Sequence, residues 1–320
     1  MLNKLNKDFI EKLKNIYSKE DIDIIEVWFN ALKRNTVFRV NTLKTNNEEI
    51  EKVLNEKNIK FKKVWFLNNA YILNEAKKSD LWELDIFKNW FIYLQSLSSQ
   101  IPLELLNIKE NCKILDITAA PGWKTSQAAA KMNNTWEIIA NDNNAIRIDK
   151  LKFTIERQWV KNVKIIKNDA RNIWKDFPEY LNYFDKIIAD LPCSAEWKFN
   201  LNNEKSYAYW KNEVVYKNYK LQKEIIKNTI SLLKEDWELI YSTCTISPEE
   251  NEAIVHMILC NFPEMKILDI NLDYKYTRNW IKKFGNVAYK TEVEKSIRIL
   301  PNIETEWFFI AKFKKLKNLG

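Results

Sequence analysis

The stretch CKILDITAAPGWKTSQ, residues 112–127, decides the fold that this sequence predicts. Its apolar residues at 112–117 predict a buried strand, a turn of small residues at 118–122 follows, and a helix is expected to begin near Lys124. Such a connection lets backbone N–H groups at a helix N-terminus approach a ligand closely. Asp116 and Lys124 place one charge of each sign beside the turn. Alone, the stretch indicates either a nucleotide-type cofactor site or an ordinary connection in a doubly wound sheet.

Strand and helix patterns alternate from residue 112 onward, which predicts an α/β fold with a mostly parallel sheet. The predicted strands lie at 112–117, 137–141, 163–167, 184–189 and 238–243. The predicted helices lie at 124–132, 144–158, 211–233 and 248–260. Two further strand-like segments, 297–300 and 307–315, are expected to complete the sheet as an antiparallel hairpin. Ligands of such sheets bind at the carboxyl ends of the strands.

The first hundred residues predict a smaller α/β unit. It begins with one or two amphipathic helices within residues 1–34. The segments that follow predict a strand at 38–43, a helix at 46–57, strands at 61–66 and 70–73, and a connection at 91–102. Its basic residues indicate either an RNA-contacting face or a solvated strand edge protected by lysines. They are Arg34, Arg39, Lys44, Lys60, Lys62 and Lys63.

Composition narrows the class of protein. The chain has 320 residues and a net charge of +8, which indicates either a polyanionic partner or a solvated basic surface. No apolar run is long enough to cross a membrane and no signal peptide is recognisable, so we expect a cytoplasmic protein. The four cysteines form no CxxC pair and His256 is the single histidine, which argues against a metal site or a disulfide framework.

Polar residues follow each of the five predicted parallel strands. They are Thr118 to Lys124, Asp142, Asp169, Asp190 with Cys193, and Cys244, in chain order. Asp142 is placed to bind the ribose hydroxyls of a nucleoside cofactor, and Asp169 is placed to contact its base. Either aspartate alone is equally typical of a helix N-cap. The combination favours a nucleoside cofactor, and the absence of a P-loop argues against ATP hydrolysis.

Two of the four cysteines are candidates for catalysis. Cys193 and Cys244 lie in short polar loops, near Asp190 and near predicted helix N-termini, where a thiolate is favoured. Two such thiols beside a cofactor site indicate covalent catalysis on an electrophilic carbon. Cys112, on a strand, and Cys260, on a helix face, are expected to be buried structural residues.

Six motifs, in order and spacing, resemble the RsmB/RsmF/NSUN (Nop2/Sun) family of RNA 5-methylcytosine methyltransferases. They are LDITAAPGWKT, ANDNNAIRIDKL, NDAR, DLPCSAEW, YWKNE and YSTCTISPEENE, and the flanking FRVNTLK and ETEWFFIAKFKK also look like that family. The resemblance covers residues 34–315. It implies a Rossmann-like class I methyltransferase domain with a seven-stranded sheet over residues 96–320, preceded by an RNA-binding domain over residues 1–95.

The resemblance also implies a mechanism. Cys244 would add to C6 of the target cytosine, Asp190 would hold the base, Cys193 would assist loss of the C5 proton or release of the adduct, and Lys124 would bond near the target or Asp190. S-adenosylmethionine would be the cofactor. Its binding residues would be Thr118, Ala119, Ala120, Pro121, Gly122, Trp123, Lys124, Asp142, Asp169 and Asp190. The target base must leave its stack to reach this pocket. The RNA would be rRNA or tRNA, the chain would act as a monomer, and the further C-terminal RNA-binding domain of some relatives is not expected.

Departures from the family pattern are almost all tryptophan in place of glycine. The chain has 3 Gly and 13 Trp, where average usage predicts about twenty Gly. The affected positions are Trp123, Trp136, Trp159, Trp197, Trp237 and Trp307, and Trp90 is similar, whereas Trp210 stands where the family itself often has Trp. Since some bacteria read UGA as glycine, we hypothesise that many of these residues are UGA codons translated with the wrong code.

Two other functions compete with RNA cytosine-C5 methylation. If Trp123 is genuine, its indole is expected to obstruct the cofactor, and the chain would be a catalytically silent RNA-binding or assembly factor on the same scaffold. A methyltransferase for another target, such as an exocyclic amine, is the third candidate. The Pro–Cys pair at 192–193 and the Thr–Cys pair at 243–244 argue against it.

Overall fold

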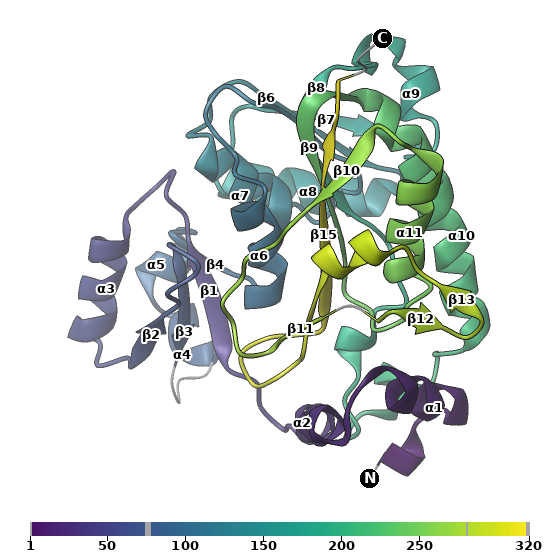
Figure 1. Ribbon diagram of the computed structural model, residues 1–320. Coiled ribbons are helices and arrows are strands. Elements are labelled where there is room, and N and C mark those ends of the chain that lie inside the picture. The colour runs from purple at the N-terminus through teal and green to yellow at the C-terminus, as the bar shows by residue number, and fades with distance from the viewer. Residues whose placement is uncertain (1, 74–77, 280, 318–320) are drawn as a thin grey trace.

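A sheet of nine strands forms the centre of the structure, a computed structural model that describes residues 2–73, 78–279 and 281–317 (Figure 1). Five of these strands are parallel neighbours in the order β9-β8-β5-β6-β7. Their bounds are β5 Lys113–Asp116, β6 Glu137–Asp142, β7 Val163–Lys167, β8 Phe184–Asp190 and β9 Leu233–Thr243. The predicted Rossmann-like α/β architecture is thus confirmed.

The remaining four strands form an antiparallel half. They are β10 Met265–Leu268, β11 Thr277–Asn279, β14 Ile297–Ile299 and β15 Phe308–Lys315. β15 pairs with β9, β14 and β10, and β11 pairs with β14. The predicted hairpin of β14 and β15 is present. The sheet has two strands more than the predicted seven, because the short β10 and β11 pair with residues far along the chain (Met265 with Lys315, Thr277 with Ile299). A two-stranded ribbon, β12 Lys283–Phe284 and β13 Val287–Ala288, lies between β11 and β14 in sequence.

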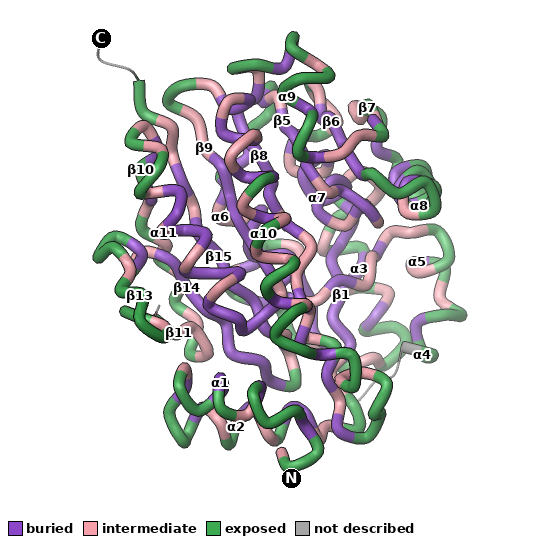
Figure 2. The backbone as a smooth tube through the Cα atoms, turned by 90° about the vertical axis from the view of Figure 1, so that its right-hand side faces the viewer, coloured by how far each residue is buried: buried purple, intermediate pink, exposed green. Residues whose placement is uncertain are grey.

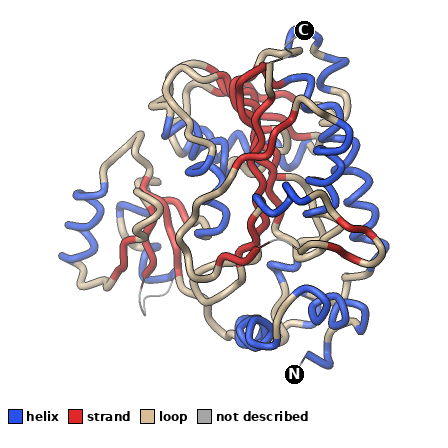
Figure 3. Tube along the Cα trace, in the orientation of Figure 1, coloured by secondary structure: helices blue, strands red, loops and turns tan. Residues whose placement is uncertain are grey.

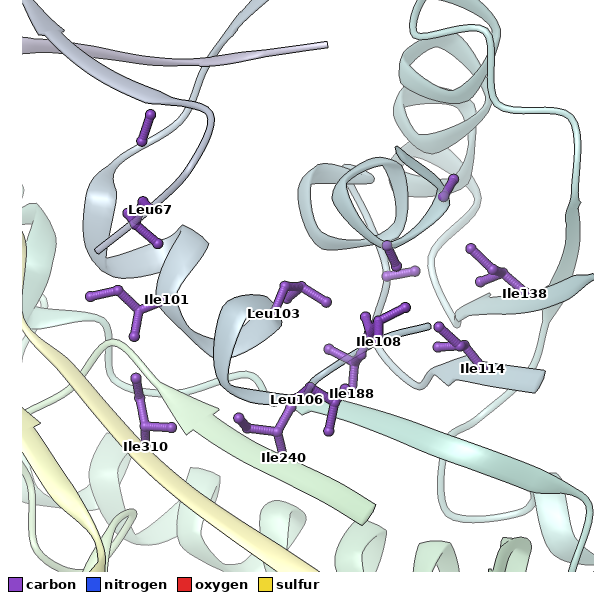
Figure 4. Packing of buried hydrophobic residues seen from close by; sticks show 14 of the residues in the cluster. Leu67, Ile101, Leu103, Leu106, Ile108, Ile114, Ile138, Ile188, Ile240 and Ile310 are labelled. Carbon is purple, nitrogen blue, oxygen red and sulfur yellow. The ribbon is translucent and has the colours of Figure 1, made fainter. Parts of the chain in front are cut away.

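Helices cover both faces of the sheet (Figure 3). One face carries α6 Leu97–Leu105, α7 Trp123–Lys131 and α8 Ala145–Arg157, whose apolar residues share one core with the sheet (Figure 4). The other face carries α9 Ile173–Asp176, α10 Asn212–Thr229 and α11 Glu252–Asn261. Successive residues of a strand point to opposite faces, so Ile114 of β5 joins the first core and Leu115 joins the second. Figure 2 shows the central strands buried and the covering helices exposed on their outer sides.

The smaller unit contains a four-stranded antiparallel sheet in the order β2-β3-β1-β4 (Figure 1). Its strands are β1 Thr36–Val40, β2 Phe61–Lys63, β3 Ala70–Leu73 and β4 Ile92–Leu94, and its helices are α3 Asn47–Glu56, α4 Lys78–Trp82 and α5 Asp85–Lys88. The first helices, α1 Lys7–Ile16 and α2 Lys19–Asn30, pack elsewhere. Phe9 of α1 and Phe29 of α2 share a cluster with Phe199 and Trp210 of the large domain.

Several element ends differ from the prediction for local reasons. The helix predicted over 211–233 ends at Thr229, and a 3-10 turn leads into β9, which begins at Leu233 rather than at residue 238. The helix predicted from residue 248 begins at Glu252, because Asn251 has a non-helical backbone (φ −116°, ψ −97°). The short 3-10 helices are η1 Leu2–Lys4, η2 Pro178–Tyr180, η3 Glu196–Lys198, η4 Glu204–Ser206, η5 Ile230–Leu232 and η6 Thr291–Lys295.

Three tryptophans have a left-handed backbone, which L side chains rarely adopt. The φ angles are 60° at Trp90, 56° at Trp136 and 60° at Trp159. Trp159 directly follows the C-cap Gln158 of α8, and the next residue, Val160, donates its backbone N–H to Ile155 O at 3.0 Å. This is the helix-ending geometry in which glycine is the usual residue. A bulky residue with positive φ is a genuine outlier.

Within the described ranges, no helix is long and apolar enough to span a membrane. The same residues contain no cluster of three or more His, Cys, Asp or Glu side chains arranged to hold a metal ion. The last three residues of the predicted catalytic domain, 318–320, lie outside the described residues.

Candidate active site

The sheet order brings the predicted polar residues to one edge. β5 lies between β8 and β6, and β9 lies beside β8, so the segments after these four strands are neighbours. Thr118, after β5, donates its hydroxyl to the backbone oxygen of Asp190, after β8, at 2.8 Å. Asp190 itself is paired in register with Ser242 near the end of β9.

The turn 118–122 requires the glycine at its end. Gly122 is the N-cap of α7 and has a φ of 103°. A Cβ atom at this position would lie 2.9 Å from Leu151 Cδ1 and 3.3 Å from Thr154 of α8, so any side chain here would force these two residues to shift. The absence of a side chain therefore fixes both the left-handed turn and the close approach of α7 to α8.

Backbone contacts hold the rest of the turn. Ala119 donates its N–H to Asn141 O at 2.7 Å, and Arg147 Nη2 donates to Ala120 O at 2.7 Å. Pro121, between Ala120 and Gly122, completes the turn. Arg147 was missed as a site residue although its segment was singled out as a motif, because the sequence does not show that α8 reaches back to this turn.

Asp116, the last residue of β5, is a buried acid that precedes the turn. Its side chain is 1% exposed and accepts a hydrogen bond from Thr125 Oγ1 at 2.6 Å. Burial raises the pKa of Asp116 to about 7, opposed by the Thr125 hydrogen bond and the charge of Lys124. The carboxyl group thus changes its protonation near neutral pH.

The two acids expected to bind a nucleoside differ in their surroundings. Asp142, at the end of β6, is 2% exposed, and its Oδ2 atom has no hydrogen-bond partner, although the Arg147 guanidinium lies 3.3 Å away. Asp169, after β7, is held by Arg171 through Nε to Oδ1 at 3.0 Å and Nη2 to Oδ2 at 2.5 Å. These bonds lower the pKa of Asp169. Both acids therefore lie beside an arginine, but Asp142 keeps one buried oxygen that accepts no hydrogen bond, whereas both oxygens of Asp169 accept from Arg171.

An ion pair joins the α7 helix to the end of β8. Lys124 Nζ lies 2.7 Å from Asp190 Oδ2 and donates to Ser99 Oγ at 3.2 Å. Lys124 is 6% exposed, while the Asp190 side chain keeps 34% of its surface open. Ser242 Oγ donates to Asp190 Oδ1 at 2.7 Å. The predicted contact between Lys124 and Asp190 is therefore present, and it orients a carboxylate that still faces solvent.

The two candidate cysteines meet beside this pair. Cys193 Sγ and Cys244 Sγ lie 3.1 Å apart, and both residues are partly exposed. The hydrogen bond with Cys244, with burial second, raises the pKa of Cys193 well above its ordinary value. This corrects the expectation of a favoured thiolate at Cys193. The physical reason is that the contact with the neighbouring thiol and burial both favour the neutral form of Cys193.

The loop that carries Cys244 is fixed by Asn251, a fully buried residue. Thr243 Oγ1 donates to Asn251 Oδ1, and Asn251 Nδ2 donates to Thr245 O at 2.9 Å. Of the other cysteines, Cys112 is buried as expected, but Cys260 is exposed. That prediction was wrong because Cys260 occupies the last turn of α11, whose outer side faces solvent.

Trp123 is the first residue of α7 and lines a groove of about 850 Å³ between the two domains. Gln95, Ser96, Arg34 and Trp197 line the same groove. Arg34 donates to Trp197 O at 3.2 Å, and this hydrogen bond connects two segments that line the groove. Arg39, by contrast, is 3% exposed and bonds to Gln95 Oε1 and Ser126 Oγ. Its side chain connects β1 with α7, so Arg39 is not exposed. This corrects the expectation that placed it with the basic residues of an RNA-contacting face or a solvated strand edge.

Comparison with known proteins decides the family. The model of the family described as 16S rRNA methyltransferase RsmB/F matches residues 103–314. The chain belongs to this RsmB/F family. A tRNA (cytosine(49)-C(5))-methyltransferase of Pyrococcus abyssi is 35% identical over 314 residues, which cover 98% of this chain and 97% of that protein. Family membership thus makes the chain an RNA methyltransferase of the cytosine-C5 class.

Other RsmB/F relatives agree. Ribosomal RNA small subunit methyltransferase F of Psychromonas ingrahamii is 33% identical over 98% of this chain, which spans 64% of that longer protein. Among solved structures, a methyltransferase homolog from Pyrococcus horikoshii has a TM-score of 0.83 and 28% identity, with 98% of both chains covered. These names favour a working methyltransferase over a silent scaffold, and cytosine C5 over an exocyclic amine.

Proposed function

We propose that the chain methylates C5 of a cytidine in rRNA or tRNA and that Cys244 is its nucleophile. The observation that carries this proposal is the pair of thiols 3.1 Å apart beside the Lys124–Asp190 ion pair. The methyl donor of the class is S-adenosylmethionine, which supplies an electrophilic methyl group when bound.

The residues at the sheet edge fit this donor. The buried Asp142 Oδ2 atom lies 3.3 Å from the Arg147 guanidinium but accepts no hydrogen bond, so it offers an acceptor for a ribose hydroxyl. Gly122 leaves room for close backbone approach at the start of α7. The other proposed binding residues for S-adenosylmethionine are Thr118, Ala119, Ala120, Pro121, Trp123, Lys124, Asp169 and Asp190.

Each proposed catalytic role uses a contact of this site. The thiolate of Cys244 adds to C6 of the cytosine, which makes C5 nucleophilic toward the methyl group. Asp190, held by Lys124 and Ser242, bonds the N3 and N4 edge of the base. After methylation C5 loses its proton, and elimination across C5–C6 releases the Cys244 sulfur. That proton passes to water. Cys193, a neutral thiol in contact with Cys244 Sγ, assists the release by donating a hydrogen bond to the departing Cys244 sulfur.

The RNA, the domain division and the oligomeric state are proposals of the same kind. Residues 1–95 comprise the N-terminal helices, which pack against Phe199 and Trp210, and the α/β RNA-recognition module. Residues 96–320 form the catalytic domain, and the boundary falls between β4 and α6. The relatives' names include both tRNA and rRNA enzymes, so the substrate is given as either. We propose a monomer that works in the cytoplasm on these RNAs.

The test is covalent trapping. RNA that contains 5-fluorocytidine is expected to form a stable adduct with the wild type, since a fluorine at C5 blocks the final elimination. Cys244→Ala is expected to abolish both the adduct and methyl transfer, whereas Cys193→Ala retains adduct formation and releases product slowly. Methyl transfer by Cys244→Ala at the wild-type rate would overturn the proposal, and RNA binding by the wild type without methyl transfer would favour the silent factor.

We also propose that the cell's protein carries glycine at many of the tryptophan positions. Support comes from Trp90, Trp136 and Trp159, which have positive φ, a conformation that costs a bulky residue of order 1–3 kcal/mol each. Trp136 and Trp159 also leave 55% of their surfaces exposed, so packing does not account for them. The gene decides: UGG at codons 123, 136 and 159 refutes the proposal, and UGA together with the mass of the natural protein supports it.

A further inference from the structure

A cluster of buried acids adjoins the two loops that carry the cysteines. Glu196 and Glu250 are both 0% exposed. Glu196 follows Cys193 by three positions in the loop after β8, and Glu250 follows Cys244 by six in the loop after β9. The cluster therefore belongs to both loops that carry a thiol.

Ser194 connects the two acids. Its Oγ lies 2.7 Å from Glu196 Oε1, makes a very short contact with Glu250 Oε1, and lies 2.8 Å from Thr245 Oγ1. The backbone N–H of Ser194 donates to Glu250 Oε2 at 3.0 Å. Since Ser194 and Thr245 directly follow the two cysteines, the acids hold both loops by their backbones and side chains.

The surroundings supply hydrogen bonds but no positive charge. Gln222 Nε2 donates to Glu250 Oε2 at 3.0 Å, and Trp210 Nε1 donates to Glu196 Oε1 at 2.7 Å. Ser247 Oγ adds a longer bond of 3.3 Å to Glu196. Among the described residues, no lysine or arginine forms an ion pair with either acid. The nearest pairs in sequence are Glu249 with Lys12 and Glu252 with Arg298.

Counting protons shows that one acid must be neutral. Ser194 Oγ has one proton, yet two carboxyl oxygens and one hydroxyl surround it. If both acids were ionised, one of these oxygens would face Ser194 Oγ with no proton between them. If Glu250 carries a proton on Oε1, it donates to Ser194 Oγ, and Ser194 donates to Glu196. Every contact of Ser194 is then satisfied.

We propose that Glu250 is a neutral carboxylic acid that positions Cys193 and Cys244 by sharing one proton with Glu196 through Ser194. Glu250 touches neither substrate nor reacting atoms, so it is a positioning residue, and the proposal rests on the function assigned above to the two thiols. The neutral state also matters for charge, because a second buried anion would oppose a thiolate in the adjoining loops.

The electrostatic surroundings agree with this geometry. Burial, and then the charge of Glu196, raise the pKa of Glu250 to about 9. The other titratable groups that face the cluster are Cys193, Tyr209 and Tyr241, and burial raises the pKa of both tyrosines. None of these groups adds a positive charge. Glu250 therefore stays mostly neutral at neutral pH.

Three variants test the proposal, with a neighbour as control. Glu250→Gln imitates the neutral acid, because its amide N–H₂ can donate to Ser194 Oγ while its oxygen accepts from Ser194 N–H and Gln222. It is expected to keep kcat and KM near neutral pH. Glu250→Ala removes the connection and is expected to lower kcat about 100-fold with KM for RNA unchanged. Glu249→Gln, beside it but paired with Lys12, is the control and is expected to change neither.

A second readout does not depend on which thiol is the nucleophile. An acid whose pKa is about 9 when folded and near its ordinary value when unfolded stabilises the fold fully below pH 4, and this contribution is lost as pH rises toward 9. The unfolding midpoint of the wild type is therefore expected to fall between pH 5 and 9 more than that of Glu250→Gln. Glu196→Gln removes the charge that faces Glu250. The unfolding midpoint of this variant is therefore expected to stop falling at a lower pH than that of the wild type.

Two results would overturn the inference. One is a kcat of Glu250→Gln at neutral pH as low as that of Glu250→Ala, which would mean that the ionised form is needed. The other is an unfolding midpoint with the same pH dependence in the wild type and Glu250→Gln. If Cys244→Ala keeps methyl transfer, the proposed function fails while this pH dependence remains, so the two failures are distinguishable.

Discussion

Replacing Lys124 by methionine is expected to weaken the site and the fold together, because this side chain joins α7 to the end of β8. Its Nζ atom lies 2.7 Å from Asp190 Oδ2 and 3.2 Å from Ser99 Oγ, and only 6% of the side chain is exposed. Methionine keeps the length and packing of the lysine stem but leaves the Asp190 carboxylate without its cation.

The structure sets the size of the effect. Removing one partner of a fully buried ion pair costs about 3–5 kcal/mol. The Asp190 side chain is 34% exposed and keeps its bond from Ser242, so water screens the orphaned carboxylate and we discount the loss to about 2 kcal/mol. Methyl transfer is expected to fall about 100-fold, since the proposed base-binding carboxylate is no longer held in place.

A double-mutant cycle isolates this interaction. Lys124→Met, Asp190→Asn and the double variant are compared by urea unfolding, and the two changes are expected to couple by about 1–2 kcal/mol. Lys131→Met is the matched control on the same helix, because Lys131 pairs with Glu104 at 2.8 Å with both partners 24% exposed. Its expected cost is below about 1 kcal/mol. Coupling below about 0.5 kcal/mol, within the usual error of additivity, would refute the reasoning.

Other variants test three separate features. Gly122→Ala is expected to abolish methyl transfer and lower stability by about 1–2 kcal/mol or more, because φ is 103° and the new Cβ meets Leu151 at 2.9 Å; an unchanged rate would contradict this. Asp116 has a pKa of about 7, raised by burial, so its contribution to stability is lost as pH rises from about 4 to about 7. Asp116→Asn is expected to flatten that part of the curve of unfolding free energy against pH. An unchanged slope would show that the raised pKa of Asp116 is not its cause. Trp159→Gly is expected to stay within about 1 kcal/mol of the parent, since relief of the left-handed strain offsets lost contacts, whereas the fully buried Trp210→Gly costs at least about 3 kcal/mol; equal losses by thermal unfolding would contradict this.

The parallel half of the sheet could be predicted because its signals are local. β7 of this half occupies the predicted range, and so does β3 of the smaller antiparallel sheet, whose apolar run is equally local. β10 and β11 could not be found in this way. Each has only three or four residues with charged side chains among them, and becomes a strand through pairing with β15 or β14. Such pairing is a property of the folded chain rather than of the segment.

The site residues, too, divide into those that the local sequence predicts and those that only the folded chain reveals. The sequence placed Asp142, Asp190, Cys193 and Cys244 at one edge because parallel strands end there, and the structure brings the last three together. It could not show that Glu250 is buried without a cation, since Glu249 and Glu252 in the same acidic run both find one. The pairing of Asp169 with Arg171, two residues apart, was within reach of sequence reasoning.

The tryptophans show where fold and residue identity separate. At Trp159 the backbone geometry is set by the end of α8 and by the bond from Val160 to Ile155, neither of which involves the indole. The surrounding chain thus imposes a left-handed backbone on residue 159 whatever its side chain, and glycine adopts this conformation without strain. Trp90, after α5, and Trp136, before β6, have the same left-handed φ. Glycine would therefore relieve backbone strain at three separate places in the fold. This is the pattern expected if, as we propose above, one cause in the reading of the gene placed tryptophan at all three positions.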